Sequence, residues 1–405
     1  MRASGAAGGA HGSWLPFALL WLAGADLRLT LLNVPPLLPL IHRDLALSET
    51  GVGMLTSLPV VLLAAAAVPG SLLIVRIGAR RALITGILIM AVASGLRGVG
   101  PSVAVLFAMT FVMGCGLAIT QTAMPSLVGQ WTPARVGLAT AIYVNGLLVG
   151  EAVGAALTLP VVLPLAGGSW ALSLALWAVP MLATVVALAT LTPRLPEPVA
   201  GVRLRWWPDW KRPETWQLGL LQGGVSAAYF GSNAFIPEFL HATGRSDLIG
   251  TCLTVLNTAQ IPASLLGALW ASRIVMRRGP FLAGAAAIVA GLGVFLLRTA
   301  WGPVLGAGIL GFSFALILVL TLALPPLLAA PEDVHRLSAG MFAISYVFSF
   351  VVPLLGGAAW DLSRVPATSF LPVVAGALVL FAASRLLPLQ GGARGRMPPL
   401  EVIGD

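Results

Sequence analysis

Long apolar stretches recur along the chain and are separated by short polar connections. A helix that crosses the hydrocarbon core of a bilayer needs about 20 predominantly apolar residues, and twelve stretches reach that length. We therefore predict an all-α polytopic membrane protein with twelve transmembrane helices. The predicted helices cover residues 15–40, 49–75, 82–100, 102–128, 138–163, 170–192, 216–240, 248–272, 280–298, 303–329, 337–360 and 367–388.

The longest polar stretch, at residues 193–215, falls between the sixth and seventh predicted helices. It divides the chain into an N-terminal six-helix bundle (1–192), a cytoplasmic linker and a C-terminal six-helix bundle with a short tail (216–405). Three features of the first half recur in the second half, each at nearly the same distance along the chain from its counterpart. They are the R-I-x-x-R-R loops Arg76–Arg81 and Arg273–Arg278, the arginines Arg97 and Arg298, and the prolines Pro125 and Pro325. This recurrence indicates a duplicated unit, as in secondary transporters that bind substrate between two halves.

The composition excludes a soluble domain. Hydrophobic residues make up 58% of the chain and charged residues 9%, whereas a soluble domain carries about 25% charged residues. With the N-terminus inside, 17 basic residues fall on the cytoplasmic side and 5 outside. This asymmetry predicts that both termini are cytoplasmic, and it accounts for the net charge of +9 without a nucleic-acid partner. The two cysteines and four histidines are not at metal-ligand spacing, so we expect no metal and no other cofactor.

Arg28 lies about midway along the first predicted helix. A charge at mid-bilayer costs about 2.5–3.5 kcal/mol on insertion scales, so such a residue normally faces a cavity or a partner. The guanidinium offers five donors in a fixed fork and stays charged, which suits a small planar anion such as a carboxylate or cyanate. Arg28 is therefore a predicted substrate-binding residue. The alternative is an internal ion pair with Asp26 or Glu151 that only holds helices together.

Glu151 lies in the fifth predicted helix, at a depth similar to that of Arg28. It lies next to a glycine strip at spacing four, Gly146, Gly150 and Gly154, whose flat surface permits close helix packing. Intramembrane carboxylates serve as proton relays in transporters, so Glu151 is the predicted proton-coupling residue. The alternative is a fixed ion pair with Arg28. The two roles combine if protonation of Glu151 frees Arg28 for the anion.

Asp26 precedes Arg28 by two residues, so their side chains point about 200° apart on a regular helix. Asp26 is the second candidate for proton coupling or ion pairing, and Asn33 shares its face. The run PPLLP at 35–39 follows and removes backbone donors, which predicts a kink in the first helix. The kink is either a hinge that moves during gating or a static bend.

Polar residues recur at helical spacing in the seventh and eighth predicted helices. Such residues share one face of a helix, and within a bilayer that face contacts protein or a water-filled cavity. The stripes and further polar positions are Gln222, Ser226, Tyr229 and Asn233 in helix seven, Asn257, Gln260 and Ser264 in helix eight, Gln121 in helix four, and Tyr346 and Ser349 in helix eleven. Hydrogen bonding between helices is the alternative to cavity lining for all of them.

Several stretches carry a resemblance to a known family. The loop RIGARR (76–81) resembles the basic part of the loop motif of the major facilitator superfamily, although Val75 replaces its acidic residue. The stretches LRLTLLNVPPLLPLI, GCGLAITQTAMPSLV and GVSAAYFGSNAFIPEFL, in helices one, four and seven, are similar to its bacterial cyanate and 2-nitroimidazole porter family. Asp26 replaces a usual asparagine, Gly129 or Gln130 an expected lysine, and Phe235 a frequent tryptophan. These departures bear on the substrate and not on the fold.

The resemblance implies the major facilitator fold of two pseudo-symmetric six-helix halves, in a bacterial inner membrane and commonly monomeric. Helices one, four, seven and ten line the central cavity in that superfamily. The resemblance therefore implies that the cavity is lined by Arg28, Gln121, Tyr229 and Asn233. Asn257 and Tyr346 complete the predicted substrate site.

Two groups of arginines lie near the ends of the predicted helices. The arginines of the basic loops are predicted to set topology and to lock the inner gate; they are Arg76, Arg80, Arg81, Arg273, Arg277 and Arg278. Arg97 and Arg298, at the outer ends of helices three and nine, either reach the surface, cap helix C-termini or form an anion-attracting vestibule.

The sequence bears on two functional classes, a secondary transporter and a membrane-embedded enzyme or sensor. A membrane-embedded enzyme needs a nucleophile–base pair or metal ligands within the bilayer, and a sensor needs a soluble output domain; the sequence offers neither. A P-loop is also absent from the sequence, so gradient-driven transport remains. We predict a transporter, not an enzyme, that moves a small polar or anionic solute by alternating access, with H⁺ as coupling ion. The alternative is efflux of a small neutral nitroimidazole-like compound that stacks on Tyr229, with Arg28 structural.

Overall fold

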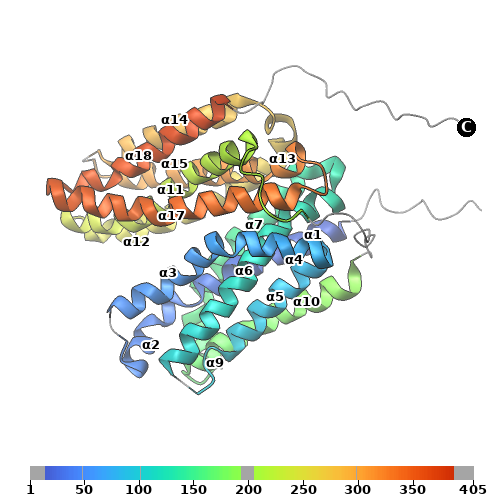
Figure 1. Cartoon of the computed structure of the whole chain (residues 1–405). Helices are drawn as coiled ribbons and strands as arrows, with labels where there is room; N and C mark the ends of the chain where they lie inside the picture. The colour runs from blue at the N-terminus through green and yellow to red at the C-terminus, as the bar shows by residue number, and fades with distance from the viewer. Residues whose placement is uncertain (1–13, 48, 101, 193–204, 298, 387–405) are drawn as a thin grey trace, which may run out of the picture.

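The computed structural model describes residues 14–47, 49–100, 102–192, 205–297 and 299–386. The N-terminal bundle holds α1 Leu15–Leu32, η1 Pro35–Leu37, α2 Leu38–Leu45, α3 Glu49–Ala65, α4 Ala67–Ile77, α5 Ala79–Leu96, α6 Val103–Trp131, η2 Pro133–Arg135, α7 Val136–Leu157, η3 Thr158–Val162, α8 Leu163–Leu165, α9 Trp170–Leu176 and α10 Ala178–Leu191. The C-terminal bundle holds α11 Pro213–Ala242, η4 Ser246–Leu248, α12 Ile249–Thr258, α13 Gln260–Ile274, α14 Arg278–Phe295, α15 Gly302–Leu322, α16 Pro325–Leu328, α17 Val334–Ser363, η5 Pro366–Phe370 and α18 Leu371–Leu386. Figure 1 shows the two bundles side by side.

The predicted fold class is confirmed. Within the described ranges, 10 helices are long and apolar enough to cross a membrane, or up to 11 when the bent pair α3/α4 counts as one span. The remaining predicted span, 216–240, lies within α11, a continuous helix of 30 residues. At 1.5 Å per residue, α11 is about 45 Å long and can cross a bilayer. The polar stripe of α11 lowers its mean hydropathy. The length of the helix, rather than its hydropathy, therefore identifies it as a membrane span.

Proline explains where several spans break. A proline has no N–H, so the carbonyl four residues earlier loses its helical hydrogen bond. α3 ends at Ala65, four residues before Pro69, and the axes on either side of the break meet at 54°. In the second half, α12 ends at Thr258, four residues before Pro262. The predicted kink of the first span is also present, because Pro35–Leu37 forms the short 3-10 turn η1 between α1 and α2.

The two bundles pack together most extensively at one end. There α7 packs against α13, α16 against α6, and α4 against α17. Residues 205–212 of the predicted linker lie across this contact: the Trp206 carbonyl accepts a hydrogen bond from Ser71 Oγ of α4 (2.7 Å), and the Trp207 carbonyl accepts one from Arg336 Nε of α17 (2.9 Å). We call the end of the molecule at which these contacts lie the linker end. Residues 193–204 of the predicted linker lie outside the described residues.

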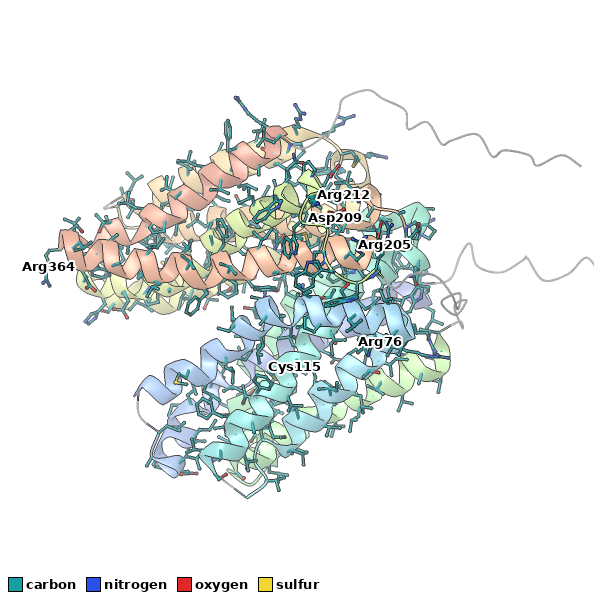
Figure 2. The ribbon with its side chains drawn as sticks, viewed as in Figure 1. Arg76, Cys115, Arg205, Asp209, Arg212 and Arg364 are labelled. Atoms are coloured by element: carbon teal, nitrogen blue, oxygen red, sulfur yellow. The ribbon has the colours of Figure 1, made fainter. Side chains whose placement is uncertain are left out.

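The opposite end of the molecule is where the bundle axes diverge (Figure 1). Figure 2 shows Arg76, Arg205 and Arg212 at the linker end, and Arg364 at the opposite end of the C-terminal bundle. The larger of two clusters of buried apolar side chains includes residues of both bundles. The contact between the bundles therefore closes the interface at the linker end. The polar residues in the middle of the bundles lie between this contact and the opposite end.

Candidate functional site

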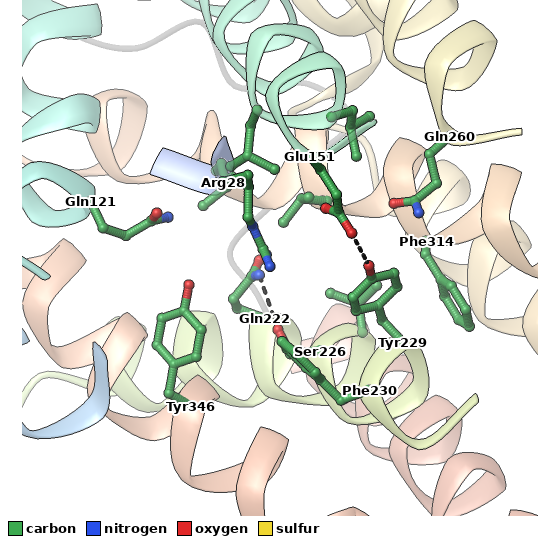
Figure 3. A pocket seen from close by; sticks show the side chains of 15 residues that line it. Arg28, Gln121, Glu151, Gln222, Ser226, Tyr229, Phe230, Gln260, Phe314 and Tyr346 are labelled. Atoms are coloured by element: carbon green, nitrogen blue, oxygen red, sulfur yellow. Dashed lines mark hydrogen bonds between the residues drawn. The ribbon is translucent and has the colours of Figure 1, made fainter. Parts of the chain in front are cut away.

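A pocket lies between the two bundles at the level of Arg28 and has a volume of about 550 Å³ including its open mouth. Side chains from seven helices line it, and its polar and aromatic members converge on one space (Figure 3). They are Arg28 of α1, Gln121 of α6, Glu151 of α7, Gln222, Ser226, Tyr229 and Phe230 of α11, Gln260 of α13, Phe314 of α15 and Tyr346 of α17. Concave sites with a few convergent polar groups are typical of small-molecule binding.

The glycine strip of α7 positions the two charged residues of the pocket. A Cβ at Gly146 would lie 2.2 Å from the Trp21 carbonyl oxygen, and one at Gly150 would lie 2.1 Å from the Ala25 carbonyl oxygen. Only glycine permits this approach, so α1 and α7 are in backbone contact, as the spacing of the strip predicted. Arg28 and Glu151 project from these two helices into the same pocket (Figure 3).

We expect Gly150→Leu to destabilise the protein by separating α1 from α7. Overpacking of a well-packed interior costs about 1–3 kcal/mol, and the nearest backbone atom leaves no room for a Cβ. Thermal unfolding of the purified protein in detergent measures the loss. Ala152→Leu is the matched control, because Ala152 is on the same helix and is exposed. Equal melting temperatures for the two variants would contradict this account of the strip.

The Arg28 guanidinium faces the pocket without a protein partner. Among the residues that the structure describes, Arg28 makes no hydrogen bond and no salt bridge, although the Glu151 charge is close enough to act on it. In Figure 3 its side chain points between Gln121, Gln222 and Glu151. The direct ion pair that was the alternative for Arg28 is therefore not formed in this conformation. Its five donors are available to an anion in the pocket.

Glu151 is held by a hydrogen-bond network from the other bundle. The Tyr229 hydroxyl donates to Glu151 Oε1 (2.9 Å) and also approaches Asn257 Oδ1 (3.3 Å). Gln260 Nε2 donates to the same Asn257 oxygen (3.1 Å). The Glu151–Tyr229 bond joins α7 of one bundle to α11 of the other. A change in the protonation of Glu151 would thus act directly on a contact between the bundles.

Two predicted binding residues support the pocket without lining it. Asn257 Nδ2 donates to Asn233 Oδ1 (3.4 Å) and to the Leu253 carbonyl (2.9 Å), and Asn233 Nδ2 donates to the Tyr229 carbonyl (3.0 Å). Both asparagines lie behind Tyr229 and fix its position. The helical stripe correctly predicted the helix face on which they lie. It could not show that their side chains lie outside the wall of the pocket.

Asp26 lies outside the pocket. It is 3% exposed, its Oδ2 has no hydrogen-bond partner, and Thr184 of α10 lies beside it. Its side chain leaves α1 on the side away from Arg28, as the angular offset predicted. Asn33 is also fully buried, with no partner for either side-chain polar atom. Within the described residues, Asp26 forms no ion pair, so its predicted role in pairing with Arg28 is wrong for this conformation.

Two aromatic lining residues were not predicted from the sequence. Phe230 follows Tyr229 in the chain, and Phe314 packs edge-on against the Tyr229 ring at 6.0 Å between centroids. Phe314 lies on α15, the tenth predicted span, which carries no charged residue to mark a functional face. The resemblance predicted that helix ten lines the cavity. Which of its residues faces the pocket depends on how the helix packs, and only the structure shows that it is Phe314.

The predicted gate arginines take different positions. Arg80 Nη2 donates to the Leu188 and Ala189 carbonyls (3.1 and 2.8 Å), so Arg80 caps the C-terminus of α10 within its own bundle. The other five are exposed near the linker end; they are Arg76, Arg81, Arg273, Arg277 and Arg278. Their roles in topology and gating stay predictions. The described residues contain no group of three or more His, Cys, Asp or Glu side chains that could hold a metal ion.

Comparisons with known proteins agree with this architecture. Residues 20–357 match the family profile of the Major Facilitator Superfamily. The cyanate transport protein CynX of Escherichia coli K12 is 28% identical over 353 residues, which cover 84% of this chain and 88% of CynX. The 2-nitroimidazole transporter of the same organism is 27% identical over 260 residues, covering 64% of this chain and 66% of that protein.

Solved structures show the same fold. The crystal structure of the transporter FucP in the outward conformation superposes with a TM-score of 0.76 at 15% identity, over 91% of this chain and 98% of FucP. The proton:xylose symporter XylE superposes with a TM-score of 0.68 at 12% identity, over 92% and 94% of the two chains. The resemblance inferred from helices one, four and seven is confirmed. With its helical spans, its pocket between two bundles and a profile match over most of its length, the chain belongs to the major facilitator superfamily.

Proposed function

We propose that this membrane transporter moves a small polar or anionic solute, of the cyanate or short-carboxylate class, by alternating access and with a proton as coupling ion. The observation that carries the proposal is the Arg28 guanidinium, which faces the pocket between the bundles with no partner among the described residues. A charged side chain without a salt bridge is costly in a membrane interior. A substrate anion would supply the direct ion-pair partner that Glu151 does not provide in this conformation.

The rest of the pocket supports a small, hydrogen-bonding anion. Gln121, Gln222 and Gln260 place side-chain amides around Arg28, and each amide can donate to an anion or accept from a protonated one. Glu151 is the only carboxylate in the lining, so an anion and Glu151 would compete for Arg28. Protonation of Glu151 removes that competition, which couples proton binding to anion binding.

The arginine asymmetry of the sequence supports the orientation of the transporter. Under the positive-inside rule the linker end is cytoplasmic, with both termini on that side of the bacterial inner membrane. The extensive bundle contacts at the linker end then belong to a state that is closed to the cytoplasm. We further propose residues 1–192 and 216–405 as the two domains that rock about the pocket, in a protein that works as a monomer.

The aromatic lining favours a second candidate, the efflux of a small neutral nitroheterocycle. Tyr229, Phe230, Phe314 and Tyr346 surround the same space and could stack on a planar ring. The relative named as a 2-nitroimidazole transporter supports this alternative. It requires no charge on the substrate, so the two candidates differ in their dependence on Arg28.

Ligand-induced thermal stabilisation separates the two candidates. A ligand at about 100-fold its Kd stabilises the folded state by about 2.7 kcal/mol. We expect cyanate, thiocyanate, nitrate or a short carboxylate to raise the melting temperature of the wild type, and Arg28→Gln to abolish that rise. Arg385→Gln is the matched control, because Arg385 is an exposed arginine in the last turn of α18.

A rise that occurs with neutral 2-nitroimidazole only, and that persists in Arg28→Gln, would overturn the anion proposal and support the efflux alternative. A rise with anions that is equal in the wild type and in Arg28→Gln would show that the anion binds elsewhere.

A further inference from the structure

Arg97 is buried inside the N-terminal bundle. It follows the last residue of α5, at the end opposite the linker, where it was expected to reach the surface, to cap a helix or to form an anion-attracting vestibule. Its side chain instead turns inward and is 1% exposed. Nη1 donates to the Thr30 carbonyl (3.4 Å), Nη2 approaches the Met113 sulfur, and Nε has no partner. These contacts are weak for a guanidinium, which normally makes charge-assisted hydrogen bonds.

No negative charge compensates Arg97. Within the described residues, no carboxylate lies within salt-bridge distance of it, and Asp26, on the same helix as Thr30, pairs with neither Arg97 nor Arg28. A buried ion without a partner keeps the full desolvation penalty, which a buried ion pair partly recovers. Arg28 and Arg97 therefore lie on neighbouring helices and neither forms a salt bridge within the described residues, although Glu151 acts on Arg28 across the first pocket.

A second pocket joins these two arginines. It has a volume of about 660 Å³ including its open mouth, and Arg28 and Arg97 both line it. Thr30, Thr110 and Phe230 are also in its wall, which is otherwise mainly apolar. Arg28 and Phe230 line the first pocket as well, so these two side chains separate the pockets. The hydroxyls of Thr30 and Thr110 already donate to the Asp26 and Leu106 carbonyls. The two guanidinium groups are thus the main free donors.

We propose that the second pocket is an anion-binding site, in which a small monovalent anion lies between Arg97 and Arg28 before it moves to the first pocket. This inference rests on the proposed function, because it assigns the same anion a second position. Two arginines that line one mainly apolar cavity favour an anion over a neutral molecule, because the cavity offers charge-assisted hydrogen-bond donors and few other polar groups. Since Arg28 borders both pockets, it can keep contact with the anion during the transfer.

Equilibrium dialysis with radiolabelled thiocyanate, in chloride-free gluconate buffer, tests the site. We expect the wild type to bind two equivalents of thiocyanate and Arg97→Met to bind one. Because Arg97→Met removes a buried charge that has no counter-ion, its melting temperature without anion should equal or exceed that of the wild type. A residue that only holds helices together would instead lower the melting temperature when it is removed.

Two further variants keep the result interpretable. Arg97→Lys retains the charge without the planar fork, so we expect the second equivalent to return with roughly tenfold weaker affinity. Arg245→Met is the matched control at the same end of the molecule, where Arg245 donates to the Thr299 and Ala300 carbonyls (2.8 and 3.0 Å) on the surface. It should bind two equivalents.

The outcomes distinguish this inference from the proposed function. One equivalent in the wild type, lost in Arg28→Gln and unchanged in Arg97→Met, would overturn the second site and leave the transport proposal standing. No thiocyanate bound by the wild type would overturn both. Chloride is then added to the gluconate buffer as a competitor. If it displaces thiocyanate from the second site but does not slow thiocyanate transport, the second site holds a resident halide and the transfer role is overturned.

Discussion

Glu151→Gln is expected to abolish proton-driven accumulation while anion exchange continues. The glutamine side chain keeps an oxygen that can accept the Tyr229 hydrogen bond (2.9 Å in the wild type) but cannot bind a proton. It therefore mimics the protonated glutamate, in which Arg28 is free for the anion. A pH difference of one unit is worth about 1.4 kcal/mol per proton, so one coupled proton supports about tenfold accumulation. Glu151→Gln should reduce that ratio to unity.

Proteoliposomes loaded with cold substrate measure exchange, and an imposed acid-outside gradient measures accumulation in the same preparation. Glu238→Gln is the matched control, because Glu238 is an exposed carboxylate on α11 outside the pocket. Full accumulation in Glu151→Gln would exclude Glu151 as the coupling residue and direct attention to Asp26. Loss of exchange as well as accumulation would mean that the charge of Glu151 is needed for binding or folding.

The apolar pattern and the spacing of small residues predicted most of the scaffold. Spanning helices follow from the length of apolar runs, and the backbone contact of α1 with α7 follows from the glycine strip. Both are local properties of the chain. The breaks after Ala65 and Thr258 are also encoded, since each lies four residues before a proline, although the apolar pattern predicts both spans as continuous.

The site was only partly predictable, because its residues are selected by packing between helices distant in sequence. A charge within an apolar run identified Arg28 and Glu151, and the polar stripe identified Tyr229. The stripe could not show where the pocket wall ends, so Asn233 and Asn257 were placed in the lining although they lie behind it. Arg97 shows the same limit: an arginine at a helix end can reach water or turn inward, and the positions of α1 and α6 decide which.

Locking the linker end is expected to stop transport completely. Asn145 of α7 bridges the bundles: it accepts from Trp21 Nε1 of α1 (3.0 Å) and donates to Ser264 Oγ of α13 (3.0 Å). This contact lies six residues before Glu151, or about 9 Å along the helix toward the linker end. Alternating access requires the bundles to separate here so that the pocket opens to the other side.

The test uses Asn145→Cys with Ser264→Cys in a chain whose Cys115 and Cys252 are replaced by alanine. A short bifunctional thiol reagent should abolish transport, and a reductant should restore it. The pair Ser363→Cys with Thr368→Cys is the matched control, because those hydroxyls are 2.6 Å apart within the C-terminal bundle and should not separate during transport. Binding to the locked protein should persist, since the pocket lies on the far side of the cross-link from the linker end. Transport that survives complete cross-linking would show that the bundles do not part at this contact, and alternating access by rocking of the two domains would then be wrong for this protein.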